Sequence, residues 1–137
     1  MSMNPRSLLG LIALVTTFDV NAGVIISSKD APFSAIDAEE AKKIFLGREV
    51  SLSGLNVTVI FQKEGDTRTN FETVILGKTG ADLTAYWSKL IFTGRAQAPV
   101  EVGSDSDVKA KVNSTPGAIG YISNGAADGS VKVLFKY

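Results

Sequence analysis

The residues with the best spacing for chemistry lie where a predicted strand, ending at Gln62, passes into a predicted helix. Backbone N–H groups at the start of a helix have no partner within the helix, and the helix dipole favours a negative charge there. Thr67 and Thr69 add hydroxyl donors, and Arg68 adds a planar guanidinium that matches an oxyanion. The predicted ligand-binding residues are therefore Gly65, Asp66, Thr67, Arg68 and Thr69.

Two carboxylates, Glu64 and Asp66, stand beside this predicted anion site and would repel a bound anion. The repulsion is relieved if one carboxylate turns away or accepts a proton from the ligand. Alternatively, Asp66 only caps the helix and Arg68 is an ordinary solvated residue of its first turn. The sequence leaves both interpretations open.

Two other segments contain residues of chemical interest. Asp105 and Asp107 could suggest a cation, but the other ligands of a calcium loop are missing, so we predict that Ser104 caps a helix here. The glycines between Thr115 and Tyr121 allow close backbone approach, and we interpret the segment as a helix end that leads into a tightly packed strand. No metal site and no cofactor are predicted.

The composition excludes several classes of function. The 137-residue chain has neither histidine nor cysteine, which excludes Ser-His-Asp and Cys-His catalysis and removes the commonest zinc ligand. Its 14 basic and 14 acidic residues balance, so no basic excess exists to neutralise nucleic-acid phosphates. A mechanism based on Glu, Asp or Lys would remain, but the spacing indicates no paired carboxylates in a pocket. We therefore predict a protein that is not an enzyme, has no catalytic residues and does not bind nucleic acid.

The first 22 residues have the pattern of a cleaved signal peptide. Arg6 gives a positively charged start, and Leu8 to Val15 form a short apolar run. Val20 and Ala22 place small residues at the positions that precede a cleavage site. The predicted organisation is a signal peptide over residues 1–22 and one domain over residues 23–137, exported to the periplasm.

The elements around the predicted site alternate between strands and helices. Val24 to Ile26 predicts a short buried strand, and Asp37 caps a helix that ends at Gly47. Val57 to Gln62 is almost continuously apolar, which is typical of a central strand buried on both faces. The helix that follows, Thr67 to Leu76, would place Phe71, Val74 and Ile75 on its inner face.

The second half of the chain continues the alternation. The strongest predicted helix runs from Leu83 to Phe92, with an apolar stripe at Leu83, Tyr86, Trp87, Leu90 and Ile91. Trp87 is predicted to lie in the core. Further strands are predicted over Val100 to Val102, Ala118 to Ser123 and Val131 to Phe135, with a helix after Ser104. This pattern predicts an α/β fold, a single small domain with a mixed sheet flanked by helices.

Three of these segments resemble a known family. Ile44 to Gly47, Ala85 to Gly94 and Pro116 to Tyr121 resemble, in order and spacing, elements of the phosphate-binding, type II periplasmic substrate-binding proteins of ABC transporters. The resemblance implies the fold of one lobe of such a protein, and phosphate or a similar oxyanion as ligand.

The chain departs from that family's pattern in two respects. The family has two lobes that clamp phosphate between them, and this chain has residues for one, so a homodimer would be needed to restore a cleft. The family's phosphate loop carries an arginine and then Ser-Gly-Thr. Here Gly65 and Asp66 stand where Ser-Gly would be, only Thr67 matches, and Arg68 lies just beyond.

Two functional hypotheses follow from the sequence. The first is an exported, non-enzymatic binding protein for phosphate or a similar oxyanion, resembling the phosphate-binding proteins of ABC transporters and completed by a second subunit. The alternative is a ligand-free interaction or structural module within a larger protein complex of the envelope.

Overall fold

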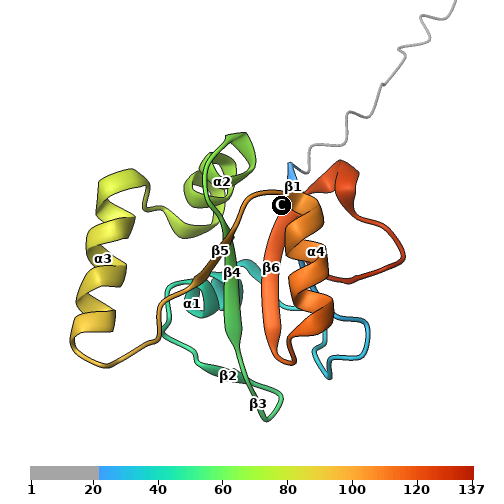
Figure 1. The fold of residues 1–137 in the computed structure, drawn as a ribbon, viewed down its shortest axis with the longest axis horizontal. Coiled ribbons are helices and arrows are strands. Elements are labelled where there is room, and N and C mark those ends of the chain that lie inside the picture. Colours follow the sequence, from blue (N-terminus) through green and yellow to red (C-terminus); the bar gives the residue numbers. More distant parts are fainter. Residues whose placement is uncertain (1–21) are drawn as a thin grey trace, which may run out of the picture.

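A five-stranded mixed sheet forms the centre of the computed structural model, which describes residues 22–137 (Figure 1). The strand order is β5-β4-β6-β1-β7. Strand β4 pairs in parallel with both β5 and β6, whereas β1 is antiparallel to β6 and β7. The strands are β1 (Gly23–Ser27), β4 (Thr58–Gln62), β5 (Val100–Val102), β6 (Ala118–Ser123) and β7 (Lys132–Lys136). The predicted fold class is confirmed.

Helices cover both faces of this sheet. They are α1 (Ala38–Phe45), α2 (Asp66–Phe71), which continues into a π-helical turn η1 (Glu72–Leu76), α3 (Gly80–Phe92) and α4 (Asp105–Ser114). Helix α4 packs on one face, α1 and α2 pack on the other, and α3 stands beside the β5 edge (Figure 1). Smaller elements are the hairpin strands β2 (Ser51–Leu52) and β3 (Leu55–Asn56) and a 3-10 turn, η2 (Asn124–Ala126).

Strand β4 has the buried position that its apolar sequence predicts. Alternate side chains of a strand point to opposite faces. Val59 and Phe61 join the aromatic-rich core under α1 and α2, and Ile60 joins the aliphatic core under α4. Phe71 stacks on Tyr121 of β6 with ring centroids 3.9 Å apart, which fixes α2 against the sheet.

The predicted caps of α1 and α4 are confirmed. Asp37 Oδ1 accepts a hydrogen bond from Glu40 N at 2.8 Å, and Ser104 Oγ accepts one from Asp107 N at 3.1 Å. Each bond satisfies a donor that the helix itself leaves free. The packed-strand interpretation of the segment before Tyr121 is also confirmed, because a side chain on Gly117 (φ 83°) would collide with the carbonyl oxygen of Asn56.

Two predicted inner-face residues lie at the surface instead. Val74 is 55% exposed and Glu72 is buried, because the wider turn of the π-helix rotates Val74 outward. On α3, Leu83 and Trp87 are buried, but Ile91 is 42% exposed. Tyr86 and Leu90 are half-buried, so the predicted stripe is only partly covered.

The predicted signal peptide falls on residues 1–21 and Ala22, so nearly all of it lies outside the described residues. Within residues 22–137, no helix has the combination of length and apolar character that crossing a bilayer requires.

Candidate functional site

The carboxyl ends of β4, β5 and β6 meet at one edge of the sheet, because these three strands run in the same direction. Helices α2 and α4 both begin at this edge (Figure 1). Ligands of open α/β sheets bind at such edges, beyond the strands and against helix N-termini. The structure therefore brings the predicted site to the position where this architecture places ligands.

The start of α2 leaves backbone donors without a partner from a capping side chain. Thr69 N donates to Gly65 O at 3.0 Å, which begins the helical hydrogen bonds, so the N–H groups of Asp66, Thr67 and Arg68 precede them. No side chain caps the helix at Gly65, whose φ of 113° is a conformation that favours glycine. Gly65, Asp66 and Thr69 are exposed and Thr67 is half-buried, so solvent reaches this helix start.

Arg68 does not point to solvent but folds back onto the scaffold. Its Nε donates to Glu72 Oε1 at 2.8 Å. Its Nη1 donates to the carbonyls of Gln62 at 2.9 Å and Lys63 at 3.1 Å, and lies 3.2 Å from Glu101 Oε1. The side chain is only 19% exposed, so the interpretation of Arg68 as a solvated residue is wrong. Asp66 as the cap is also wrong, because Gly65 holds that position.

The charge of Arg68 is largely neutralised by these contacts. Burial alone would lower the pKa of Arg68, but hydrogen bonds to Glu72 and Glu101 outweigh it and raise the pKa above the ordinary arginine value. The guanidinium therefore stays charged and ties the carboxyl end of β4 to α2. Glu72 and Glu101 already occupy the guanidinium of Arg68. Binding of an anion at this edge would therefore depend mainly on the backbone N–H groups and the threonine hydroxyls.

The start of α4, at the same edge, is closed by its own side chains. Asp105 Oδ1 accepts hydrogen bonds from Gln62 Nε2 at 2.6 Å and from Ser123 N at 3.2 Å, and its Oδ2 accepts one from Ser123 Oγ at 2.6 Å. The Tyr121 hydroxyl accepts from Gln62 N at 3.0 Å, and burial raises the pKa of Tyr121. This network of Gln62, Asp105 and Ser123 was not predicted; the polar Gln62 ending an apolar strand was the available signal.

Metal binding has no support at this edge. Within residues 22–137, no group of three or more acidic, histidine or cysteine side chains is arranged to hold a metal ion. Asp105 has the hydrogen-bonding role described above, and Asp107 follows the capping residue Ser104.

Comparison with known proteins supports the predicted fold. No family model and no curated protein matches the chain. Among solved structures it is similar to an ABC-type phosphate transport receptor from Vibrio cholerae, at 21% identity and a TM-score of 0.66. It is equally similar to a phosphate ABC transporter substrate-binding protein with bound phosphate from Clostridium perfringens, at 21% identity and a TM-score of 0.66. The third is PstS from Borrelia burgdorferi, at 21% identity and a TM-score of 0.65.

These similarities cover 83% of this chain but only 44–46% of the three proteins. The chain thus spans less than half the length of the structures it matches. The resemblance that the sequence indicated is confirmed at the level of the fold, which is that of part of a phosphate transporter's substrate-binding protein.

Proposed function

We propose that this chain is an exported, non-enzymatic binding protein for phosphate or a similar small oxyanion. The observation that carries the proposal is the uncapped, solvent-accessible start of α2, at the ligand edge of a fold shared with three phosphate transport proteins. The N–H groups of Asp66, Thr67 and Arg68 would hold the oxyanion, and the hydroxyls of Thr67 and Thr69 would add to them.

The acidic neighbours of this site favour a ligand that carries its own proton. Glu64 and Asp66 are exposed beside the helix start and accept hydrogen bonds but donate none when ionised. A phosphate with one or two bound protons can donate to such a carboxylate, whereas fully ionised sulfate can only be repelled. We therefore expect phosphate to bind more tightly than sulfate.

A second chain would complete the site. An oxyanion on the α2 start alone would remain largely hydrated, because the site lies at an exposed edge. Since the matched proteins are more than twice as long as the aligned part, a homodimer or an envelope partner such as an ABC transporter could cover the open side.

Calorimetric titration of phosphate into the purified protein tests this function. We expect saturable binding, weaker binding of sulfate, and a loss of about tenfold in affinity for Thr67→Val, which removes one donor. Thr73→Val is the matched control, because Thr73 lies further along the same segment and its hydroxyl bonds Thr69 O. Absence of heat up to millimolar phosphate would refute oxyanion binding, and the stoichiometry would reveal a shared site.

Export of the protein can be tested through the cleavage of the predicted signal peptide. Cleavage after Ala22 would leave Gly23 as the first residue of the domain over residues 23–137, as small residues before a cleavage site indicate. The intact mass of protein recovered from the periplasm of a Gram-negative host should match this mature form. Recovery of the uncleaved chain in the cytoplasm would contradict the localisation.

A ligand-free interaction module in the envelope is the second candidate. It is favoured by the neutralisation of Arg68 by Glu72 and Glu101, and by Phe92, which is 91% exposed at the end of α3. Adjacent exposed apolar side chains are typical of contact surfaces, and the neighbouring Ile91 is 42% exposed. Under this function phosphate would not raise the melting temperature, and Phe92→Ser would reduce the size of the native complex in sedimentation experiments.

A further inference from the structure

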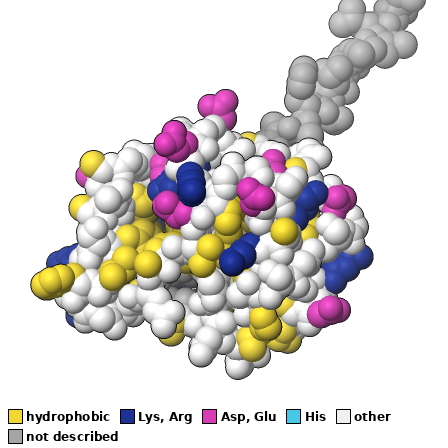
Figure 2. All heavy atoms as spheres, viewed as in Figure 1, with side chains coloured by type: hydrophobic (Ala, Val, Ile, Leu, Met, Phe, Trp, Pro, Cys, Tyr) yellow, Lys and Arg dark blue, Asp and Glu magenta, His cyan; other side chains and the backbone are white. Residues whose placement is uncertain are grey.

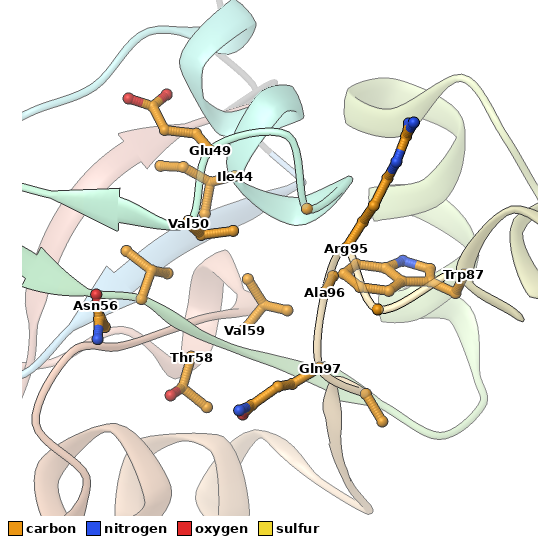
Figure 3. Close-up of a pocket in the computed structure, with 14 residues that line it drawn as sticks. Ile44, Glu49, Val50, Asn56, Thr58, Val59, Trp87, Arg95, Ala96 and Gln97 are labelled. Atoms are coloured by element: carbon orange, nitrogen blue, oxygen red, sulfur yellow. The ribbon is translucent and has the colours of Figure 1, made fainter. Parts of the chain in front are cut away.

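A cavity of about 500 Å³ lies well away from the α2 start, between the beginning of β4 and the segment that follows α3 (Figure 3). Its lining comes from four parts of the chain: the end of α1 with the following loop, β3 with β4, Trp87 on α3, and residues 94–98. Volumes of 300–1,000 Å³ are typical of sites for small organic ligands. The size and the converging elements make this cavity a candidate second site.

The centre of the cavity is apolar. Trp87, which is 7% exposed, forms one wall, and Val59 and Ile44 lie across from it (Figure 3). The indole packs closely against Gly47, where an added Cβ would lie 3.0 Å from its Cη2 atom. Such walls would bury the apolar body of a ligand.

Neutral hydrogen-bonding groups lie at the margin of the apolar centre. The amide of Gln97 extends toward Thr58 at one end (Figure 3), and Asn56 lines the same cavity. Within residues 22–137 none of these three side chains makes a hydrogen bond. The buried Nε1 of Trp87 also lacks an acceptor there. Buried polar groups are normally satisfied, so the indole N–H of Trp87 is available to a ligand. Gln97 and Asn56 are exposed and Thr58 is half-buried, so these side chains could exchange water for a ligand.

Charge at the cavity is balanced. Glu49 and Arg95 line it with opposite charges, and Figure 3 shows both charged ends turned away from Val59 at the centre. No ion pair involving either residue forms within the described part of the chain. A ligand in the cavity centre therefore meets apolar walls and neutral amide and hydroxyl groups rather than a net charge.

We propose that this cavity binds a neutral, amphipathic small molecule, with a branched aliphatic or aromatic body against Trp87 and a carbonyl or amide group toward Gln97 and Thr58. The site is separate from the α2 start. It would exist whether or not the chain binds an oxyanion.

Trp87 reports on this proposal directly, because it is the only tryptophan of the chain and gives a single indole N–H resonance. The probe is N-acetyl-L-leucinamide, titrated into the purified protein and followed by proton–nitrogen correlation spectra. N-acetylglycinamide is the matched ligand, since it has the same amides without the apolar body. We expect a saturable shift of the indole resonance with the leucine compound, and at least about tenfold weaker binding of the glycine compound.

Two matched substitutions test whether the response comes from the cavity. Ala98→Phe places a large side chain at an exposed lining position, and Ala110→Phe makes the same change at an exposed position of α4. Ala98→Phe should weaken binding at least about tenfold, whereas Ala110→Phe should leave it unchanged. A shift that does not saturate up to the solubility limit of the probe, or one that survives Ala98→Phe, would overturn the proposal.

Discussion

The starts of α2 and α4 lie at the same edge of the sheet but differ in what their side chains do. At α4, Ser104 caps the helix and Asp105 is held by Gln62 and Ser123. At α2, Gly65 provides no cap, and Arg68 turns back toward β4 and Glu72. One helix start thus has a donor capped by its own chain, and the other has no side-chain cap. Figure 2 shows acidic and basic side chains together along this upper edge.

This difference distinguishes residues that stabilise the fold from groups that are free to bind a ligand, which the sequence alone does not separate. The charged side chains of the edge stabilise the fold, and the uncapped N–H groups remain for a ligand. Substitutions of charged residues that are largely buried, such as Arg68, should therefore change stability strongly, whereas substitutions of exposed residues near the α2 donors should change binding.

The largest effect is expected from Arg68→Ala. The free energy of unfolding should decrease by about 3 kcal/mol, because Glu72, with a side chain only 8% exposed, would keep a buried charge without its partner. Urea denaturation measures the change. Arg48→Ala, at an exposed position, is the control and should change it by less than about 0.5 kcal/mol. Equal effects of the two substitutions would contradict the structural role of Arg68.

Asp105→Ala should have the next largest effect. It removes the acceptor of three hydrogen bonds, from Gln62 Nε2, Ser123 N and Ser123 Oγ, and should decrease the free energy of unfolding by about 2 kcal/mol. Asp107→Ala, in the same helical turn, should decrease it by less than about 1 kcal/mol, since only a helix-dipole contribution is lost. If both substitutions had the same effect in urea denaturation, the hydrogen bonds of Asp105 with Gln62 and Ser123 would not contribute to stability as described.

Alkaline pH should destabilise the protein, because two tyrosines are buried in the folded state. Burial raises the pKa values of Tyr121 and Tyr137 in the folded state, so both stay protonated there after they ionise in the unfolded chain. Their contribution is complete below the unfolded pKa of about 10 and is lost as the pH rises above it. The free energy of unfolding should decrease by up to about 1.4 kcal/mol per pH unit for each tyrosine. In Tyr121→Phe the slope should be about half, and an unchanged slope would show that Tyr121 is not buried.

Glu101→Gln should have the smallest effect on stability, and it tests separately whether charge at the α2 start affects phosphate binding. Glu101 is 50% exposed, so the loss of its ion pair with Arg68 should change stability by less than about 1 kcal/mol. The same substitution removes a negative charge near the α2 start and frees part of the guanidinium. Phosphate affinity, measured by calorimetry, should therefore rise by about two- to fivefold. Weaker binding would indicate that Arg68 needs Glu101 to hold its position.

Local patterns were sufficient to predict most of the fold. The caps at Asp37 and Ser104 and the apolar run of β4 depend on neighbours within a few residues, and all are confirmed. The outward position of Val74 was not predictable in this way, because a π-helical turn depends on packing rather than on apolar spacing.

The site itself depends on contacts between distant segments. The Arg68–Glu72 spacing of four residues was a visible signal for an internal ion pair. The contact of Arg68 with Glu101 spans 33 residues and required the parallel pairing of β4 with β5. The cavity beside Trp87 is likewise built from four separate segments, so the prediction that Trp87 lies in the core was confirmed without revealing the cavity.

The most direct test of the central claim is a phosphate titration followed by the backbone amide resonances of the protein. We predict saturable shifts at Asp66, Thr67 and Arg68, whose N–H groups would contact the oxyanion, and no comparable shifts at the capped start of α4. Amides of Asp66, Thr67 and Arg68 that do not respond to phosphate, or shifts that are larger at α4, would contradict the proposed binding of an oxyanion at the α2 start.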